Sequence, residues 1–182
     1  YRPLPATSWI RRYSIGPSFT YITDLNNRLQ TRDVSVAAFM NLETGDWIGL
    51  RFRERFERLD EPFEIHDGID VPAGRHRFGA YSLEVFSDKG RRFYSNGVIE
   101  MSDFWTGSRV RLSIDGTANV STRFSVSSDY EFNRVCLPKG NFETNAMSNR
   151  LLYTFSTDMF ARGLVQWNSK REIVGFNGLW NW

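Results

Sequence analysis

The chain of 182 residues has 41% hydrophobic residues and a net charge of +2, so it can form one domain, or part of a larger one, with a sizeable core. No run approaches the roughly 18 consecutive apolar residues of a membrane helix, and the basic residues are spread along the chain. These features exclude a helical membrane protein and predict no nucleic-acid partner. Cys136 is the only cysteine, which excludes an internal disulfide.

Apolar and polar residues alternate with a period of two, the pattern of a β-strand between two different environments. The first two runs span residues 10–23 and 29–42, separated by "DLNNR". A third run lies within "DWIGLRFRERFERLDEPFEI", residues 46 to 65. Its apolar residues are Ile48, Leu50, Phe52 and Phe56, and the residues that alternate with them are Arg51, Arg53 and Arg55.

The longest connection, "RLDEPFEIHDGIDVPAGRHR", then leads to seven further runs. The phase of the fifth run is ambiguous, and we favour Phe93, Ile99 and Met101 as its apolar side. No segment predicts an amphipathic helix. The runs from the fourth to the tenth centre on residues 81–85, 91–102, 109–114, 124–132, 147–155, 161–167 and 174–182.

The connections predict an up-and-down meander, because long or medium ones alternate with tight ones. "RLDEPFEIHDGIDVPAGRHR" is followed by "SDKG", "DFWTGS" by "DGTAN", and "NRVCLPKGN" by "STDM". Membrane barrels have short turns at one end and longer loops at the other. The runs are also close to the 9–11 residues that a tilted strand needs to cross a bilayer. We therefore expect residues 1–182 to be a single all-β, β-barrel-like region of about ten antiparallel strands, cut at both ends and without an internal domain boundary.

In such a transmembrane barrel the apolar side faces lipid and the arginine side faces a water-filled lumen. Asp129 and Glu131 are candidate partners for the arginines of the third run. That arginine row would bias passage toward anionic solutes, or it would only neutralise carboxylates that point inward. The predicted lumen-lining residues are Arg51, Arg53, Arg55, Arg109, Arg111, Arg123, Arg150 and Arg162. The predicted lipid-facing residues are Ile48, Leu50, Phe52, Val110, Leu112, Ile114, Phe124, Val126, Leu151, Tyr153 and Phe155.

Two features of composition agree with this interpretation. The 23 basic residues include only three lysines, all in connections, whereas soluble β-proteins commonly protect exposed surfaces and edges with lysine. Aromatic residues make up 15% of the chain. Trp47, Phe104, Trp105 and Phe160 lie near the ends of runs, where an aromatic girdle at each lipid–water boundary would place them.

Three segments, "RLDEPFEIHDGIDVPAG", "CLPKGNFETNAMSNRLLYTFSTDMFARGLVQWNS" and "GFNGLWNW", resemble the C-terminal region of a bacterial protein family of unknown function. The resemblance covers nearly the whole chain and is strongest from about residue 56 to 168. Family members typically begin with a family-9-type carbohydrate-binding module, and their C-terminal portion is similar to an outer-membrane β-barrel. The resemblance implies a location in the bacterial outer membrane and contact with membrane lipid or lipopolysaccharide. It also implies contact with carbohydrate, through a domain outside this chain.

The sequence predicts no catalytic residue, no metal site and no cofactor. His66 and His76 are the only histidines, and "EIHDGID" lacks the spacing of a metal site. Glu64, Asp67 and Asp70 lie nearby and offer paired carboxylates, as glycosidases do, but acidic loop residues are usually only solvated.

Two alternatives to the membrane barrel remain open. One is a soluble β-sandwich carbohydrate-binding module with Trp105 and Trp167 as stacking platforms. The other is a β-rich, membrane-associated hydrolase, a label that some relatives of the resembled family carry.

Overall fold

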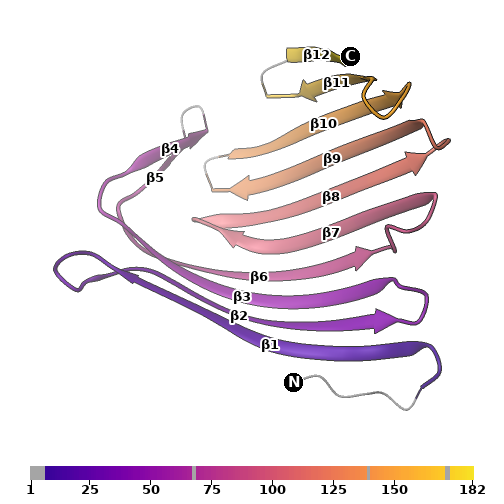
Figure 1. Ribbon diagram of the computed structural model, residues 1–182. Coiled ribbons are helices and arrows are strands. Elements are labelled where there is room, and N and C mark those ends of the chain that lie inside the picture. Colours follow the sequence, from indigo (N-terminus) through magenta and orange to yellow (C-terminus); the bar gives the residue numbers. More distant parts are fainter. Residues whose placement is uncertain (1–6, 67–68, 139, 171–172) are drawn as a thin grey trace.

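The computed structural model describes residues 7–66, 69–138, 140–170 and 173–182, and these residues form one large antiparallel sheet (Figure 1). The sheet has ten strands in the order β1-β2-β3-β6-β7-β8-β9-β10-β11-β12, so each strand pairs with its neighbours along the chain. The predicted all-β up-and-down meander is confirmed. The strands are β1 (Ile10–Thr23), β2 (Leu29–Leu42), β3 (Trp47–Leu59), β6 (Gly74–Phe86), β7 (Phe93–Phe104), β8 (Gly107–Asn119), β9 (Phe124–Leu137), β10 (Gly140–Thr154), β11 (Phe160–Asn168) and β12 (Ile173–Asn181).

The long connection after β3 contains a second, two-stranded sheet of β4 (Phe63–His66) and β5 (Ile69–Val71). Figure 1 shows this hairpin beyond the end of the main sheet, joined to it by the extended ends of β3 and β6. We call these segments together, residues 56–77, the arm. The arm end of the sheet also holds the turns β1–β2, β7–β8, β9–β10 and β11–β12, and the other turns lie at the opposite end.

The predicted rhythm of long and short connections is wrong beyond the arm. β7 continues to Phe104 and β8 begins at Gly107, so most of "DFWTGS" is strand. Trp105 closes that hairpin in the left-handed conformation, with φ 53°, which tight hairpin turns require. Likewise β9 continues to Leu137 and β10 begins at Gly140, so "NRVCLPKGN" is mostly ladder. In both hairpins the backbone ladder continues through residues whose composition predicted a loop.

The sheet is a single open layer with β1 and β12 at its edges. The chain exposes 12360 Å², whereas a compact monomer of 21.2 kDa exposes about 9,100 Å². Among the described residues only six hydrophobic ones are buried, namely Ile10, Ala37, Phe56, Val71, Val135 and Leu137. The fold therefore has almost no core of its own. No helix in the described part of the chain is long and apolar enough to cross a membrane.

Candidate functional site

The register of the ladders sorts the strand residues into two faces. Leu50 is paired with Ala38 on β2 and with Leu83 on β6, and the same row continues through Ile99 to Leu112. Because paired residues share a face, one side of the sheet carries a largely apolar surface. It is interrupted by the paired residues Ser128 and Asn149 and by the ion pair of Arg134 with Glu143. We call it the apolar face. It contains the predicted lipid-facing residues Ile48, Leu50, Phe52, Val110, Leu112, Ile114, Phe124, Val126, Leu151 and Tyr153, and it continues onto Phe155 in the turn after β10.

The apolar face lies open to solvent. Tyr81 and Phe176 are 66% and 77% exposed, and Leu50 is 61% exposed. Most of the other large hydrophobic residues in these strands are at least one third exposed as well. An apolar surface that spans ten strands far exceeds the few hundred Å² that monomeric soluble proteins usually expose, so it marks a surface that another phase or partner covers.

The other side of the sheet, the polar face, carries a network of ion pairs. The Nε of Arg51 lies 3.2 Å from a carboxylate oxygen of Glu84. Arg53 and Arg55 approach the carboxylate of Asp33 at 3.6 and 3.5 Å, and Arg55 also reaches Glu57 at 3.2 Å. The arginine row of the third run is therefore neutralised by β2, by β6 and by its own strand.

The two arginines of β8 form ion pairs with carboxylates on the neighbouring strands. Arg109 lies 2.6 Å from Glu100 on β7, and Arg111 lies 2.7 Å from Glu131 on β9. The expected pairing of Asp129 and Glu131 with the arginines of β3 is wrong, because three strands separate β3 from β9. Arg150 on β10 and Arg162 on β11 share the polar face, and Arg123 lies in the turn before β9.

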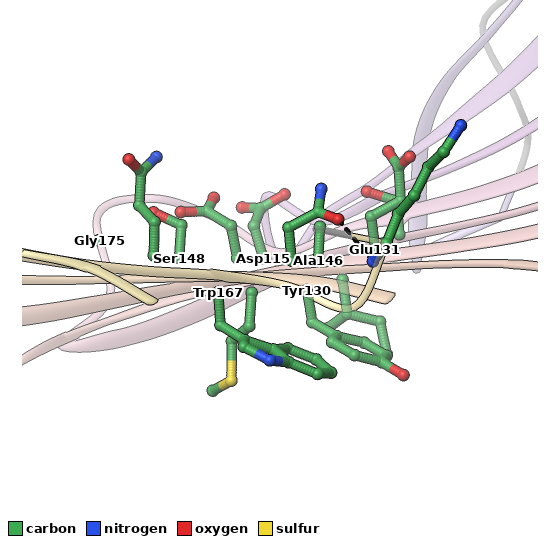
Figure 2. A pocket seen from close by; sticks show the side chains of 14 residues that line it. Asp115, Tyr130, Glu131, Ala146, Ser148, Trp167 and Gly175 are labelled. Atoms are coloured by element: carbon green, nitrogen blue, oxygen red, sulfur yellow. Dashed lines mark hydrogen bonds between the residues drawn. The ribbon is translucent and has the colours of Figure 1, made fainter. Parts of the chain in front are cut away.

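A hollow of about 660 Å³ lies on the polar face near β8 to β11 (Figure 2). In Figure 2, Asp115, Glu131 and Ser148 project to one side of the sheet, and Tyr130 and Trp167 project to the other. Asp115 is directly opposite Asp129 across the ladder, and its Oδ2 accepts a hydrogen bond of 2.6 Å from Asn96. The lining on the polar face therefore includes the carboxylates of Asp115, Asp129 and Glu131, next to the arginine-rich part of the same face.

The long connection shows no arrangement of catalytic or metal-binding groups in its described residues. His76 belongs to β6, and its Nε2 lies 3.0 Å from the carbonyl oxygen of Pro72. Asp67 and the side chain of His66 lie outside the described residues. Across the described ranges, no three His, Cys, Asp or Glu side chains come together in a way that could hold a metal ion.

Trp105 lies in the turn between β7 and β8 and is surrounded by aromatic rings. Its ring centre is 5.0 Å from that of Phe63, 5.2 Å from that of His76 and 5.0 Å from that of Phe78. This cluster joins the arm to the β7–β8 turn at the same end of the main sheet. Trp105 is therefore half-buried rather than a free stacking platform, whereas Trp167 is 39% exposed on the apolar face.

Three of the four predicted girdle residues, Trp47, Phe104 and Phe160, lie on the polar face instead of the apolar face. Trp47 is in phase with Arg51 and stacks on Phe86 with ring centres 3.9 Å apart. Phe104 and Phe160 also lie on the polar face, where Arg109 and Arg162 lie over their rings at 5.3 and 5.7 Å. Phe104 and Phe160 therefore pack against arginines of the polar face, and Trp47 packs against Phe86.

A different row of aromatic residues crosses the apolar face at the end opposite the arm. The ring centres of Phe124 and Tyr153 are 6.3 Å apart, those of Tyr153 and Phe155 4.6 Å, and those of Phe155 and Trp180 5.0 Å. Phe93 begins β7 at the same end and is 63% exposed. In the sequence, Phe124 lies two residues before Val126 and Tyr153 lies two residues after Leu151. This spacing predicts that each lies on the apolar face with its neighbour.

The turns at this end are tied together by Asp46, which lies between β2 and β3. Its carboxylate accepts hydrogen bonds from Thr44, from Arg91 and from the backbone amide of Asp88, and these bonds lower the pKa of Asp46. In the β1–β2 turn, hydrogen bonds from the backbone amide and the side chain of Arg28 lower the pKa of Asp24.

Comparisons with protein families, with curated proteins and with solved structures find no match to this chain.

Proposed function

We propose that this chain is a segment of an outer-membrane β-barrel, with its apolar face against lipid and its polar face toward an aqueous lumen. The observation that supports this proposal most strongly is the uncovered apolar face, because burial in hydrocarbon is what gives such a surface a stable environment. In lipid every backbone polar group needs an internal partner, and a continuous antiparallel ladder supplies one at all strands except the two edges.

The dimensions of the apolar face fit a bilayer. On β8 the apolar positions run from Val110 to Ala118, and on β9 from Phe124 to Phe132 with Ser128 as an interruption. Eight residue steps at a rise of about 3.3 Å span about 26 Å along the strand. With the usual strand tilt of about 40° this distance corresponds to a height of about 20 Å, close to the apolar band of about 25 Å in outer-membrane barrels.

The two edge strands are incomplete surfaces. β1 and β12 each leave one row of backbone donors and acceptors without a strand partner in the described part of the chain. In hydrocarbon such edges are unacceptable, so the proposal requires β1 and β12 to meet each other or to pair with further strands of the full-length protein.

The polar face supports a structural role for its arginines rather than strong anion selectivity. Each arginine of the row on β3, and both on β8, has a carboxylate within 3.6 Å. Such pairs hold charges in a wet interior at little net cost. We propose that the barrel anchors an attached carbohydrate-binding part, or forms a channel for it, and we assign no catalysis to this segment. The attached part rests on the sequence resemblance alone.

Folding in detergent tests the proposal. The full-length protein is refolded with and without detergent micelles and run on a denaturing gel before and after boiling. We expect a compact, faster-migrating band that forms only in detergent and disappears on boiling. A monodisperse, stable species in plain buffer would instead favour the soluble β-sandwich alternative, in which another layer covers the apolar face.

A further inference from the structure

Four arginines gather at the arm end of the apolar face. Arg32 on β2 and Arg77 on β6 flank Phe56 of β3 in the ladder, and Arg58 is paired with Arg75 one row further along the arm. The alternation along β3 and β6 places all four on the same face as Leu50. Arg32 lies on β2 and the other three arginines lie at the two ends of the long connection, so only the register between the strands brings the four together.

The arginines of this group are poorly neutralised. Arg58 and Arg75 are directly opposite each other, an arrangement in which like charges destabilise a sheet. The Nε of Arg58 is buried and has no hydrogen-bond partner in the described part of the chain. Arg32 has a carboxylate partner, Glu54 at 2.8 Å. An anion between the two strands would relieve the repulsion and satisfy these donors.

Two carboxylates share this part of the ladder with the four arginines. Glu54 lies on the same face but is already paired with Arg32. Asp103 at the end of β7 accepts a hydrogen bond of 2.7 Å from the backbone amide of Gly79. Within the ladder, four arginines against these two carboxylates leave a net charge of +2, and Asp60 and Glu61 follow Arg58 just beyond it.

The group borders directly on the apolar face. Phe52 and Tyr81 are paired in the ladder, with ring centres 5.0 Å apart, and the next residues on this face toward the arm are Glu54 and Phe56. A shallow groove of about 520 Å³ bridges the two regions, lined by Phe52, Tyr81 and Met101 on one side and by Arg77, Glu54 and Asp103 on the other. Of the four arginines only Arg77 lines this groove, so a fitting ligand would place its apolar part in the groove and an anionic headgroup beyond it, over Arg58 and Arg75.

We propose that Arg32, Arg58, Arg75 and Arg77 form a binding site for the phosphate groups of lipid A, the membrane anchor of lipopolysaccharide. Guanidinium groups match phosphate geometry with paired hydrogen bonds. We take the arm, the longest connection, as an outward-facing loop, toward the leaflet that contains lipopolysaccharide, even though the β7–β8 turn at the same end is tight. This inference rests on the proposed membrane barrel and assigns the arm end of its apolar face to one lipid.

The test compares two variants of the full-length protein with the same loss of charge. The first replaces Arg58, Arg75 and Arg77 with Gln. The control replaces Arg12, Arg150 and Arg162 with Gln; these are exposed arginines on the other face. Each protein is reconstituted into phosphatidylcholine vesicles with or without purified lipid A, extracted in mild detergent, and analysed for bound lipid A by native mass spectrometry.

We expect the first variant to retain at least about tenfold less lipid A than the wild type, and the control to stay within about twofold. Equal retention by the wild type and the first variant, or an equal loss in the control, would overturn the proposal. Dephosphorylated lipid A provides a second test that needs no variant. The wild-type protein should bind it at least about tenfold more weakly than lipid A, and equal binding would contradict the phosphate site. Millimolar inorganic phosphate should not displace lipid A, and displacement would assign the site to free phosphate instead.

The gel assay separates the two proposals. A wild-type protein that shows no detergent-dependent, heat-sensitive band refutes the membrane barrel itself. A protein that shows the band but does not distinguish lipid A from its dephosphorylated form refutes only the lipid A site.

Discussion

Replacing Ile114 with Arg probes the centre of the apolar face. Ile114 is the third of five positions on this face of β8, between Val110 and Ala118, so about 13 Å of strand separates it from either border. It faces Gly97 and Tyr130 across the ladder and is 45% exposed. In water such a surface change alters the free energy of unfolding by no more than about 0.5 kcal/mol. At a bilayer midplane it costs about 2–4 kcal/mol.

Two control variants on the same strand set the scale. Ser113→Arg places the charge on the polar face opposite Glu131, where we expect a change below about 1 kcal/mol. Ser108→Arg lies on the apolar face but at its arm-end border, opposite Asp103, and should cost about 0–1 kcal/mol. Guanidinium-induced unfolding of the full-length protein from phospholipid vesicles, followed by tryptophan fluorescence, gives all three values. A cost at Ile114 no larger than at Ser113 would refute the assignment of this face to lipid.

Three further predictions concern the ion pairs, the close packing and the turns. Glu84→Gln should lower the free energy of unfolding by about 1–3 kcal/mol in urea or guanidinium titrations, because it leaves Arg51 without its carboxylate. Glu43→Gln breaks the exposed pair with Arg11 at the β2–β3 turn and should cost less than about 0.5 kcal/mol. Gly107→Ala should cost about 1–3 kcal/mol because the added Cβ would collide with the carbonyl oxygen of Cys136. In Gly163→Ala the added Cβ meets open space, so this variant should be neutral. Comparable unfolding midpoints for the two variants would contradict the packing. Asp46 has a lowered pKa, so its stabilising effect is complete above its ordinary pKa of 3.8 and is lost as pH falls through the lowered value. When unfolding is followed from about pH 6 to pH 2, the loss of stability in acid should therefore be shallower in Asp46→Asn than in the wild type. An unchanged slope would argue against these hydrogen bonds.

The strands could be predicted from the sequence because their alternation is long and regular. The predicted ranges 10–23 and 29–42 agree with β1 and β2 at both ends. The favoured phase of the fifth run is also confirmed, because Ile99 is paired between Leu83 and Leu112 on the apolar face. A period of two places side chains on alternate faces whatever the register, so this level of structure needs no knowledge of the neighbouring strands.

The ion pairs could not be predicted, because they depend on the register between strands. Arg51 reaches Glu84 and Arg111 reaches Glu131 only because each diagonal neighbour lies two residues along the paired strand. A shift of one residue would move each carboxylate to the opposite face. Sequence gave no measure of that register across β3 and β6, which are separated by the arm.

The face on which Trp47 lies, in contrast, could have been predicted from the sequence. Trp47 is four residues before Arg51 in an uninterrupted strand, so the two share a face. The expectation of a girdle relied on the nearness of Trp47 to the strand end and ignored its parity. The aromatic row of Phe124, Tyr153 and Trp180 satisfies both conditions.

The orientation of the two faces in a bilayer is the central claim, and a pair of adjacent positions tests it most directly. In the full-length protein with Cys136 replaced by Ser, single cysteines at Leu112 and at Ser113 are labelled with an environment-sensitive fluorophore after reconstitution into vesicles. We predict that lipid-attached nitroxides quench the label at position 112 and that aqueous iodide quenches the label at position 113. Quenching of both labels by iodide alone, or the reverse pattern, would contradict a lipid-facing apolar surface.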